Sequence, residues 1–297
     1  MAGTLTHYKI AEEVLNRTKI PLDKEVYFLA SQGHDLLYFI KLKDLPTFKE
    51  VKEQCKLIQK KKFYELVKTY LKELDNEFSL VVKSFLYGYI THHIVDSIFH
   101  PFIIYETGIY KNTKETKKYQ GNHERLESMI DVLLTKDVHR FYKKVPKLKN
   151  TKKLKEVTQK VFKEVYDRED IGQALIKNMN NVRSFLRIYR TDIFKIKKLG
   201  YKVVDKITGK YYEFLSFNYS KKDLDQIDLK AKMKWHHPQD NEQMKASILD
   251  LYEQSIEKTL KTLDNIEKGN IKEEDLDISS TTGKSSKIKE TLCYFRN

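Results

Sequence analysis

Apolar residues recur every three or four positions along most of the chain, which is the spacing of helices that bury one face. The stretch from Ser79 to Phe99 departs from this rule because its residues are apolar nearly all round. A helix without a polar face belongs in the core of a protein. The pattern therefore predicts a buried central helix here, which Pro101 should end or kink.

The remaining pattern predicts further helices joined by polar connections. They lie after Thr6, over Thr47 to Leu74 as one helix or two, from His123 to about Leu134 with Asn122 as the cap, over Val157 to Tyr166, over Ile171 to Tyr189 and over Met244 to Ile266. Residues Tyr201 to Phe217 fit either another helix or a short hairpin. Gly108 to Gly121 is a polar connection, and Asp223 to Asp240 is polar and extended in character.

The chain beyond Gly269 is rich in Ser, Thr and Lys, above all in the run Ser279 to Ser286. Such a composition is typical of flexible segments. We therefore expect one helical domain over residues 1–268 and a flexible C-terminal tail over residues 269–297.

Composition favours an all-α fold, because the 297 residues include only 10 Gly and 5 Pro while Lys, Glu, Leu and Ile dominate. The chain shows no signal peptide, and no window reaches the roughly 18 apolar residues that span a bilayer. We therefore expect a cytoplasmic protein. Cys55 and Cys293 have no metal-ligand spacing and should be inert thiols in a reducing compartment.

The formal net charge of +14 is spread over many Lys-rich segments rather than gathered in one block. A solvated helix surface is the favoured interpretation, and contact with anionic lipid or nucleic acid is the alternative. In either case a positive field favours anionic substrates.

Ionisable residues interrupt the central apolar helix at a fixed interval. His92, Asp96 and His100 recur at i, i+4 and i+8, so their side chains share one face. In the next helix His123 and Glu127 repeat the i, i+4 relation by which one helix donates two ligands to one ion. The spacing therefore predicts metal ligands on both helices.

Burial makes the metal interpretation stronger than spacing alone. Ionisable side chains on an apolar helix are costly in a core unless something compensates them. A single buried His and Asp pair is most often a core hydrogen bond. Two helices with such pairs, together with His7 and the His34-Asp35 doublet upstream, favour a site for several metal ions. Imidazole and carboxylate ligands without cysteine suit catalytic Zn²⁺, and also Mn²⁺ and Fe²⁺.

The remaining histidines stay outside this predicted site. His93 points about 100° away from the preceding residue on the helix, and is either a donor to a metal ligand or a core residue. His139 lies in a basic segment and is predicted to be at the surface. His236 and His237 are either packing residues or part of a substrate entrance.

Four patches of the sequence resemble the zinc-dependent phospholipase C family, which is related in fold to the single-strand-specific zinc nucleases. They are Thr6-His7-Tyr8, Gln32-Gly33-His34-Asp35, the run Gly88 to Asp96 followed by His100-Pro101, and the run Asn122 to Glu127. The family pattern has an N-terminal His, a Gly-x-Asp loop, a His-x-x-x-Asp core helix followed shortly by another His, and a His-x-x-x-Glu helix, and this chain has them in that order. The resemblance implies an all-α, multi-helical phospholipase C-like bundle with metal ligands on the buried central helix.

The resemblance also implies two or three Zn²⁺ ions. The implied ligands are Asp35, His92 and Asp96 for one ion, His100, His123 and Glu127 for a second, and His7 with Asp96 for a third. Asp96 would then bridge two ions.

The chain departs from the family pattern in two places. No His occurs between His34 and His92, where the family has another ligand and where Gln59 falls near the expected position. His34 or a water would take that ligand's place, or the first site is weaker. Secreted members also use an N-terminal Trp as a ligand, which this chain lacks.

By the same resemblance the protein is a metal-dependent phosphodiester hydrolase in which zinc-activated water attacks the phosphorus. Asp35 is the expected catalytic residue, because at the edge of the site it can orient or deprotonate that water. The expected substrate is an anionic phosphodiester, with phospholipid favoured over nucleic acid. Contact with a membrane surface is compatible with this, and no obligate protein partner is expected.

Two other interpretations stay open. His34-Asp35 fits the doublet of an HD-type nucleotide phosphohydrolase, with His7 and Asp96 as the remaining ligands, but this leaves the ligands of the second implied ion without a role. A non-catalytic helical module, whose metal is structural or lost and whose basic surface binds a partner or membrane, is supported by the missing His near Gln59.

Overall fold

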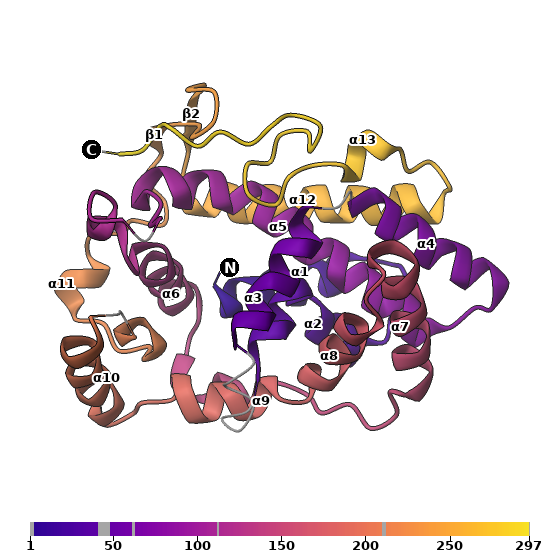
Figure 1. Ribbon diagram of the computed structural model, residues 1–297, viewed down its shortest axis with the longest axis horizontal. Coiled ribbons are helices and arrows are strands. Elements are labelled where there is room, and N and C mark those ends of the chain that lie inside the picture. The colour runs from indigo at the N-terminus through magenta and orange to yellow at the C-terminus, as the bar shows by residue number, and fades with distance from the viewer. Residues whose placement is uncertain (1–2, 41–47, 61–62, 112, 210–211, 297) are drawn as a thin grey trace.

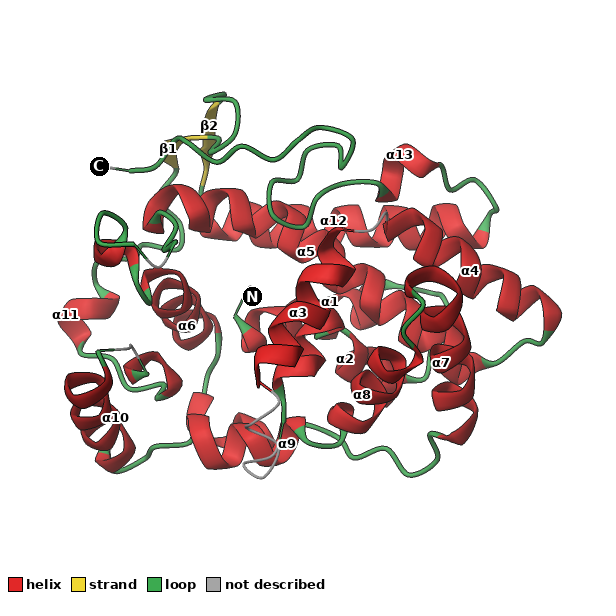
Figure 2. Cartoon of the chain, in the orientation of Figure 1, coloured by secondary structure: helices red, strands yellow, loops and turns green. Residues whose placement is uncertain are grey.

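A computed structural model describes residues 3–40, 48–60, 63–111, 113–209 and 212–296. Within these ranges the chain is a bundle of helices with one small antiparallel sheet (Figures 1 and 2). The α-helices are α1 (Thr4–Arg17), α2 (Lys24–Ala30), α3 (Phe48–Lys60), α4 (Phe63–Asn76), α5 (Leu80–Thr107), α6 (Asn122–Leu134), α7 (Lys152–Tyr166), α8 (Glu169–Met179), α9 (Val182–Phe185), α10 (Ile196–Thr208), α11 (Lys221–Leu224), α12 (Ile248–Glu267) and α13 (Glu273–Leu276). Shorter helical segments are η1 (Gly33–Tyr38), η3 (Lys117–Tyr119), η4 (Val138–Lys143), the π-helical η5 (Leu186–Arg190) and η6 (Glu213–Leu215), and the strands are β1 (Met233–His236) and β2 (Gln243–Ala246). The predicted all-α class is confirmed.

The central helix α5 is buried on every side over most of its length, as its apolar pattern predicted. Ser79 caps its first turn by accepting a hydrogen bond from the Val82 N–H. Helix α2 lies directly against it, because a Cβ at Gly88 would come within 2.5 Å of the Tyr27 carbonyl oxygen. This close packing brings the loop after α2 beside the polar face of α5. Over the described part of the chain, no helix is long and apolar enough to cross a membrane.

Helix α5 continues through Pro101 to Thr107, so of the two predicted outcomes, an end or a kink, the end does not occur. A proline inside a helix removes one hydrogen bond, at a cost of about 3 kcal/mol. Phe102 and Ile103, just beyond the proline, are almost fully buried. Burying each such side chain stabilises the fold by about 2 kcal/mol, which offsets the cost of the proline.

Two helix starts differ from those predicted. Helix α1 begins at Thr4 and not after Thr6, and the Thr6 hydroxyl, inside the helix, donates a hydrogen bond of 2.8 Å to Asp131 Oδ1. Helix α6 begins at Asn122, and its cap is Gly121 with a φ of 76°. A positive φ favours glycine, so the cap is Gly121 and not the predicted Asn122.

The middle of the chain follows the prediction with shifted boundaries. The predicted helix or helices over Thr47 to Leu74 are α3 and α4, and residues 41–47 and 61–62 lie outside the described ranges. Helix α10 supports the helical interpretation of the stretch after Tyr201. The hairpin of the structure is β1 paired with β2, where Trp235 lies opposite Met244. Helix α12 therefore begins at Ile248 and not at Met244.

The segment after Gly269, expected to be a flexible tail, packs along α5 in the structure (Figure 1). Leu276 and Thr282 are buried, and a short β-bridge joins Ile278 to Ser285. Its serines and threonines bind backbone groups of the same segment, as in the Ser279 hydroxyl that accepts from the Thr282 N–H at 3.1 Å. The polar residues of this segment therefore stabilise local turns that pack against the rest of the protein.

Candidate metal centre

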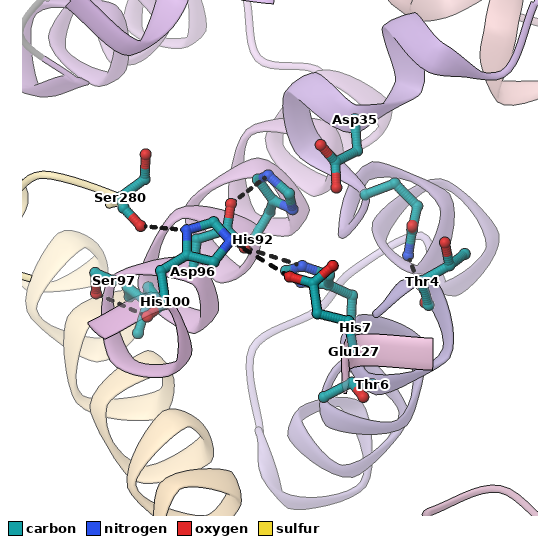
Figure 3. Close-up of polar contacts among 12 residues, drawn as sticks. Thr4, Thr6, His7, Asp35, His92, Asp96, Ser97, His100, Glu127 and Ser280 are labelled. Atoms are coloured by element: carbon teal, nitrogen blue, oxygen red, sulfur yellow. Dashed lines mark hydrogen bonds and ion pairs between the residues drawn. The ribbon is translucent and has the colours of Figure 1, made fainter. Parts of the chain in front are cut away.

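The three predicted metal ligands of α5, His92, Asp96 and His100, lie on one face of the helix, where α1 and α6 approach it (Figure 3). His92 and Asp96 are fully buried, and His100 is nearly so. His92 Nε2 lies 3.1 Å from Asp96 Oδ2, and His100 Nε2 lies 3.7 Å from Asp96 Oδ1. The structure thus brings together the three side chains that the i, i+4, i+8 spacing placed on one face.

His7 reaches the same carboxylate from α1. Its Nε2 lies 3.2 Å from Asp96 Oδ1, and its ring stacks on His92 with the ring centroids 4.4 Å apart. His7, His92 and Asp96 form the α1 group, in which ligand atoms of all three residues lie within 4.8 Å of one another.

A second cluster, the α6 group, joins α5 to α6. His123 Nε2 lies 2.8 Å from Glu127 Oε1, and His100 Nε2 lies 3.7 Å from the same oxygen. The three ligand atoms again lie within 4.8 Å of one another. Because His100 is also 3.7 Å from Asp96, the α6 group is continuous with the α1 group.

The third cluster, the loop group, consists of His34, Asp35 and His92. His34 Nδ1 lies 3.1 Å from His92 Nε2, and His34 Nε2 lies 3.8 Å from Asp35 Oδ1. Gly33 makes this approach possible, since it has a φ of +47° and a Cβ on it would lie 2.1 Å from the His92 ring.

The loop group differs from the ligand set that the resemblance implied. Asp35 was expected to share an ion with His92 and Asp96, whereas the structure groups Asp35 with His92 and His34. Gln59 of α3, near the position of the missing family histidine, lies with its Nε2 3.2 Å from His34 Nε2. His34 therefore occupies the space between Gln59 and His92.

These three groups have the chemistry and spacing of zinc ligands. Nitrogen and oxygen ligands at 2.0–2.1 Å from a tetrahedral zinc lie about 3.3 Å from one another. Most of the separations above are close to that value. Two buried atoms, Asp35 Oδ1 and His100 Nε2, have no hydrogen-bond partner in the described chain. Buried polar atoms without partners are costly, and a coordinated cation removes that cost.

Burial also sets the protonation of these side chains. It lowers the pKa of His7 to about 4 and that of His100 to about 3, so both imidazoles are neutral at pH 7 and can coordinate metal. Burial raises the pKa of Asp35 to about 7 and that of Glu127 well above its usual range. Burial acts in the same direction on Asp96, but His92 and His100 outweigh it and hold the pKa of Asp96 well below the usual value.

Asp131, which the sequence did not single out, fixes the position of α1. This fully buried carboxylate of α6 accepts hydrogen bonds from the Leu5 N–H at 3.1 Å, the Thr6 N–H at 2.8 Å and the Thr6 hydroxyl at 2.8 Å. A carboxylate at a helix N-terminus also interacts favourably with the helix dipole. The next residue is His7, so Asp131 determines where that imidazole lies. Its only sequence signal is an acidic residue within an apolar run of α6.

Ser280 supports the site from the C-terminal segment. Its carbonyl oxygen accepts a hydrogen bond of 2.7 Å from His100 Nδ1 (Figure 3). Such a bond fixes the tautomer and leaves Nε2 free to bind metal. Gly283, three residues on, lies against the Ser97 carbonyl, where a Cβ would approach the oxygen to 2.3 Å. A backbone carbonyl has no side-chain signature, so the sequence carried no signal for this contact.

A cavity of about 540 Å³ opens beside the loop group. Its walls come from α3, α5 and the C-terminal segment, and include His34, Lys56, Gln59, His92, Ser280 and Lys289. Two lysines and two histidines of the loop group thus line the same cavity. A cavity of this size holds a small polar headgroup or nucleotide.

The other histidines lie outside the three groups. His93 is buried and stacks on Phe63 with centroids 3.8 Å apart, and it also lines the cavity. His139, predicted to be at the surface, is partly buried and accepts a hydrogen bond from the Asp192 N–H at 3.3 Å. His237 is buried and donates to the Thr282 carbonyl at 2.8 Å, so it packs the C-terminal segment.

Comparison with known proteins gives one match. A family model described as zinc dependent phospholipase C matches residues 6–172. No curated protein and no solved structure matches the chain. The matched residues contain every member of the α1, α6 and loop groups, whereas α10 and the C-terminal segment lie beyond them.

Proposed function

Because the chain belongs to the zinc-dependent phospholipase C family, we propose that it hydrolyses a phosphodiester bond of a phospholipid at the centre formed by the α1, α6 and loop groups. The observation that carries the proposal is the continuity of the three groups: the α1 and loop groups share His92, and His100 of the α6 group lies 3.7 Å from Asp96 of the α1 group. A phosphodiesterase-like role follows from the family, and the lipid, the ligand assignment and the mechanism are our proposal.

His7, His34, Asp35, His92, Asp96, His100, His123 and Glu127 would hold two or three zinc ions. When bound, the ions polarise phosphoryl oxygens and lower the pKa of a coordinated water from its bulk value toward about 7. The contacts of Asp96 with His7, His92 and His100 support the proposal that it would be a ligand shared by two ions. The carboxylates Asp35, Asp96 and Glu127 bring three negative charges against four to six positive ones, which leaves a cationic centre for a phosphodiester.

Asp35 is the proposed catalytic residue. It lies buried in η1, and its partners in the loop group, His34 and His92, line the cavity. Its carboxylate would orient the attacking water and accept its proton. In-line attack then breaks the bond between phosphorus and the leaving oxygen, and the proton passes to that oxygen as it departs.

The cavity favours an anionic substrate. Lys56 of α3 and Lys289 of the C-terminal segment line it together with one acidic residue, Glu290, so its lining carries a net positive charge. The ammonium groups of these lysines would hold the phosphate of the substrate beside the α1, α6 and loop groups. Phospholipid is favoured over nucleic acid because the family is one of phospholipases.

The HD-type alternative gains less support. His34 and Asp35 are indeed neighbours in the loop group, but the α6 group would then be a second cluster of ligands without a role. The family match includes both clusters.

A panel of phosphatidylcholine, single-stranded DNA and cyclic nucleotides, each assayed with the zinc-loaded protein, tests the proposal. We expect release of diacylglycerol and phosphocholine from the first. Hydrolysis of cyclic nucleotides alone would favour the HD-type reaction. No hydrolysis of any phosphodiester by zinc-loaded protein would leave the non-catalytic module as the better description.

A further inference from the structure

Helix α10 has its polar and apolar faces reversed relative to an ordinary surface helix. None of its residues is buried, yet Ile196, Leu199 and Val203 are exposed large apolar side chains, as are Val204 and Ile207. At about 100° per residue these five positions occupy one arc of about 140°. Phe194, two residues before the helix begins, is also 81% exposed.

The polar side of α10 faces the protein and is firmly bound to it. Asp192 caps the helix by accepting from the Lys197 N–H at 3.0 Å and the Lys198 N–H at 2.9 Å. The Lys197 ammonium donates to the Thr191 carbonyl at 2.6 Å, and the Tyr201 hydroxyl donates to the Tyr189 carbonyl at 3.1 Å.

The same anchoring continues to the end of the helix. Asp205 accepts from the Tyr212 N–H at 2.6 Å and from the Glu213 N–H at 3.1 Å. Lys198 also pairs with Glu213 at 3.1 Å. With the polar side fixed in this way, the apolar side is turned outward, at the edge of the molecule in Figure 1.

The described chain concentrates its exposed large apolar residues here. Eight of them fall between residues 188 and 207, namely Ile188, Ile193, Phe194, Ile196, Leu199, Val203, Val204 and Ile207. Contiguous exposed apolar surface on a folded protein marks an interaction site. We call these eight residues the α10 face.

Exposed lysines border one side of the α10 face. Residues 187–209 contain seven Lys or Arg and two Asp. Both aspartates are engaged in the anchoring just described, whereas Lys195, Lys202 and Lys206 are exposed. Lys202 and Lys206 lie along one edge of the apolar arc at about 100° per residue. An apolar arc bordered by lysines is the pattern of helices that lie in the interface of an anionic membrane.

We propose that the α10 face docks the protein on an anionic lipid bilayer, with the apolar arc inserted among the acyl chains and the lysines at the headgroups. This deepens the proposed function, on which it rests for the choice of lipid as partner. The docking surface lies outside the family-matched residues and is distinct from the metal groups.

Sedimentation with vesicles tests the docking directly. The zinc-loaded protein should pellet with vesicles of phosphatidylglycerol and phosphatidylcholine, less with pure phosphatidylcholine, and less at high salt because salt screens the lysines. The triple variant F194S/L199S/I207S should bind the anionic vesicles at least about tenfold more weakly. Phe78→Ser is the matched control, since Phe78 is 68% exposed but distant in sequence from the α10 face, and it should bind as the unchanged protein does.

Hydrolysis of a short-chain phospholipid below its micelle concentration separates the two proposals. The triple variant should keep this monomer activity and lose activity on vesicles. If no variant hydrolyses the monomer, the proposed function fails while vesicle binding still judges the docking. Unchanged vesicle binding by the triple variant would overturn the docking proposal. So would a dimer in solution that the triple variant converts to a monomer, because the α10 face would then join two copies of the chain.

Discussion

Helices α5 and α10 break the usual division between buried apolar and exposed polar residues in opposite directions. α5 buries His92 and Asp96 completely, whereas α10 leaves Leu199 and Ile207 in solvent. Each exception is costly unless something outside the helix compensates it. For α5 the compensation would be metal ions, and for α10 a lipid surface. The residues that contradict the ordinary pattern of their own helix are thus those that point to function.

The largest effect should come from the buried carboxylate of α5. Asp96→Asn replaces the carboxylate that contacts His7, His92 and His100 with a neutral amide. We expect phosphodiesterase activity to fall by more than about a thousandfold, equal to about 4 kcal/mol of transition-state stabilisation. His236→Gln is the control, because His236 of β1 belongs to none of the three groups and does not line the cavity. If Asp96→Asn hydrolysed its substrate as fast as that control, Asp96 could not bridge two ions.

Replacing one isoleucine by serine in each helix compares how much the apolar residues of α5 and α10 contribute to the free energy of unfolding. Ile94 of α5 is fully buried and Ile207 of α10 is 79% exposed. Ile94→Ser should lower the free energy of unfolding by about 3–4 kcal/mol, because it leaves a cavity and a buried hydroxyl. Ile207→Ser should change it by no more than about 0.5 kcal/mol. Denaturant unfolding measures both, and a comparable loss at Ile207 would mean that the α10 face is packed in solution.

A smaller effect should follow from loosening the C-terminal segment over α5. Gly283 and Gly269 both have a φ of +67°, but a Cβ would meet the Ser97 carbonyl at Gly283 and open space at Gly269. Alanine at either position carries the same backbone strain. Gly283→Ala should therefore cost about 1–2 kcal/mol more than Gly269→Ala, because only there must the neighbouring backbone shift.

Displacement of the C-terminal segment in Gly283→Ala should also lower the affinity for metal. Moving the segment would weaken the bond from His100 to the Ser280 carbonyl, and loss of such a supporting bond lowers metal affinity about 10- to 100-fold. Competition with a chelator measures this. Equal zinc affinity of the two alanine variants would show that the C-terminal segment does not position His100.

Much of the candidate metal centre was predictable because several of its residues are close together in sequence. The i, i+4 pairs of His92 with Asp96 and of His123 with Glu127 follow from helix geometry alone. Asp131 was missed because it acts on Thr6, 125 residues away in sequence, and nothing in either segment indicates the pairing.

The rest of the chain shows the same limit. Composition alone suggested a flexible tail after Gly269, but the contacts of Ser280 and Gly283 with α5 depend on tertiary packing. The lysines around α10 were visible in the sequence. Which side of that helix faces the protein was not, since Lys197 and Tyr201 face inward only because backbone carbonyls of η5 and its neighbours accept their hydrogen bonds.

Zinc content of the purified, folded protein tests the central claim most directly. Elemental analysis should give two or three zinc ions per chain, and at least one fewer in Asp96→Asn while His236→Gln keeps the full number. A folded protein that binds no zinc when zinc is supplied would contradict the account, because the buried groups around Asp96 would then be compensated without an ion.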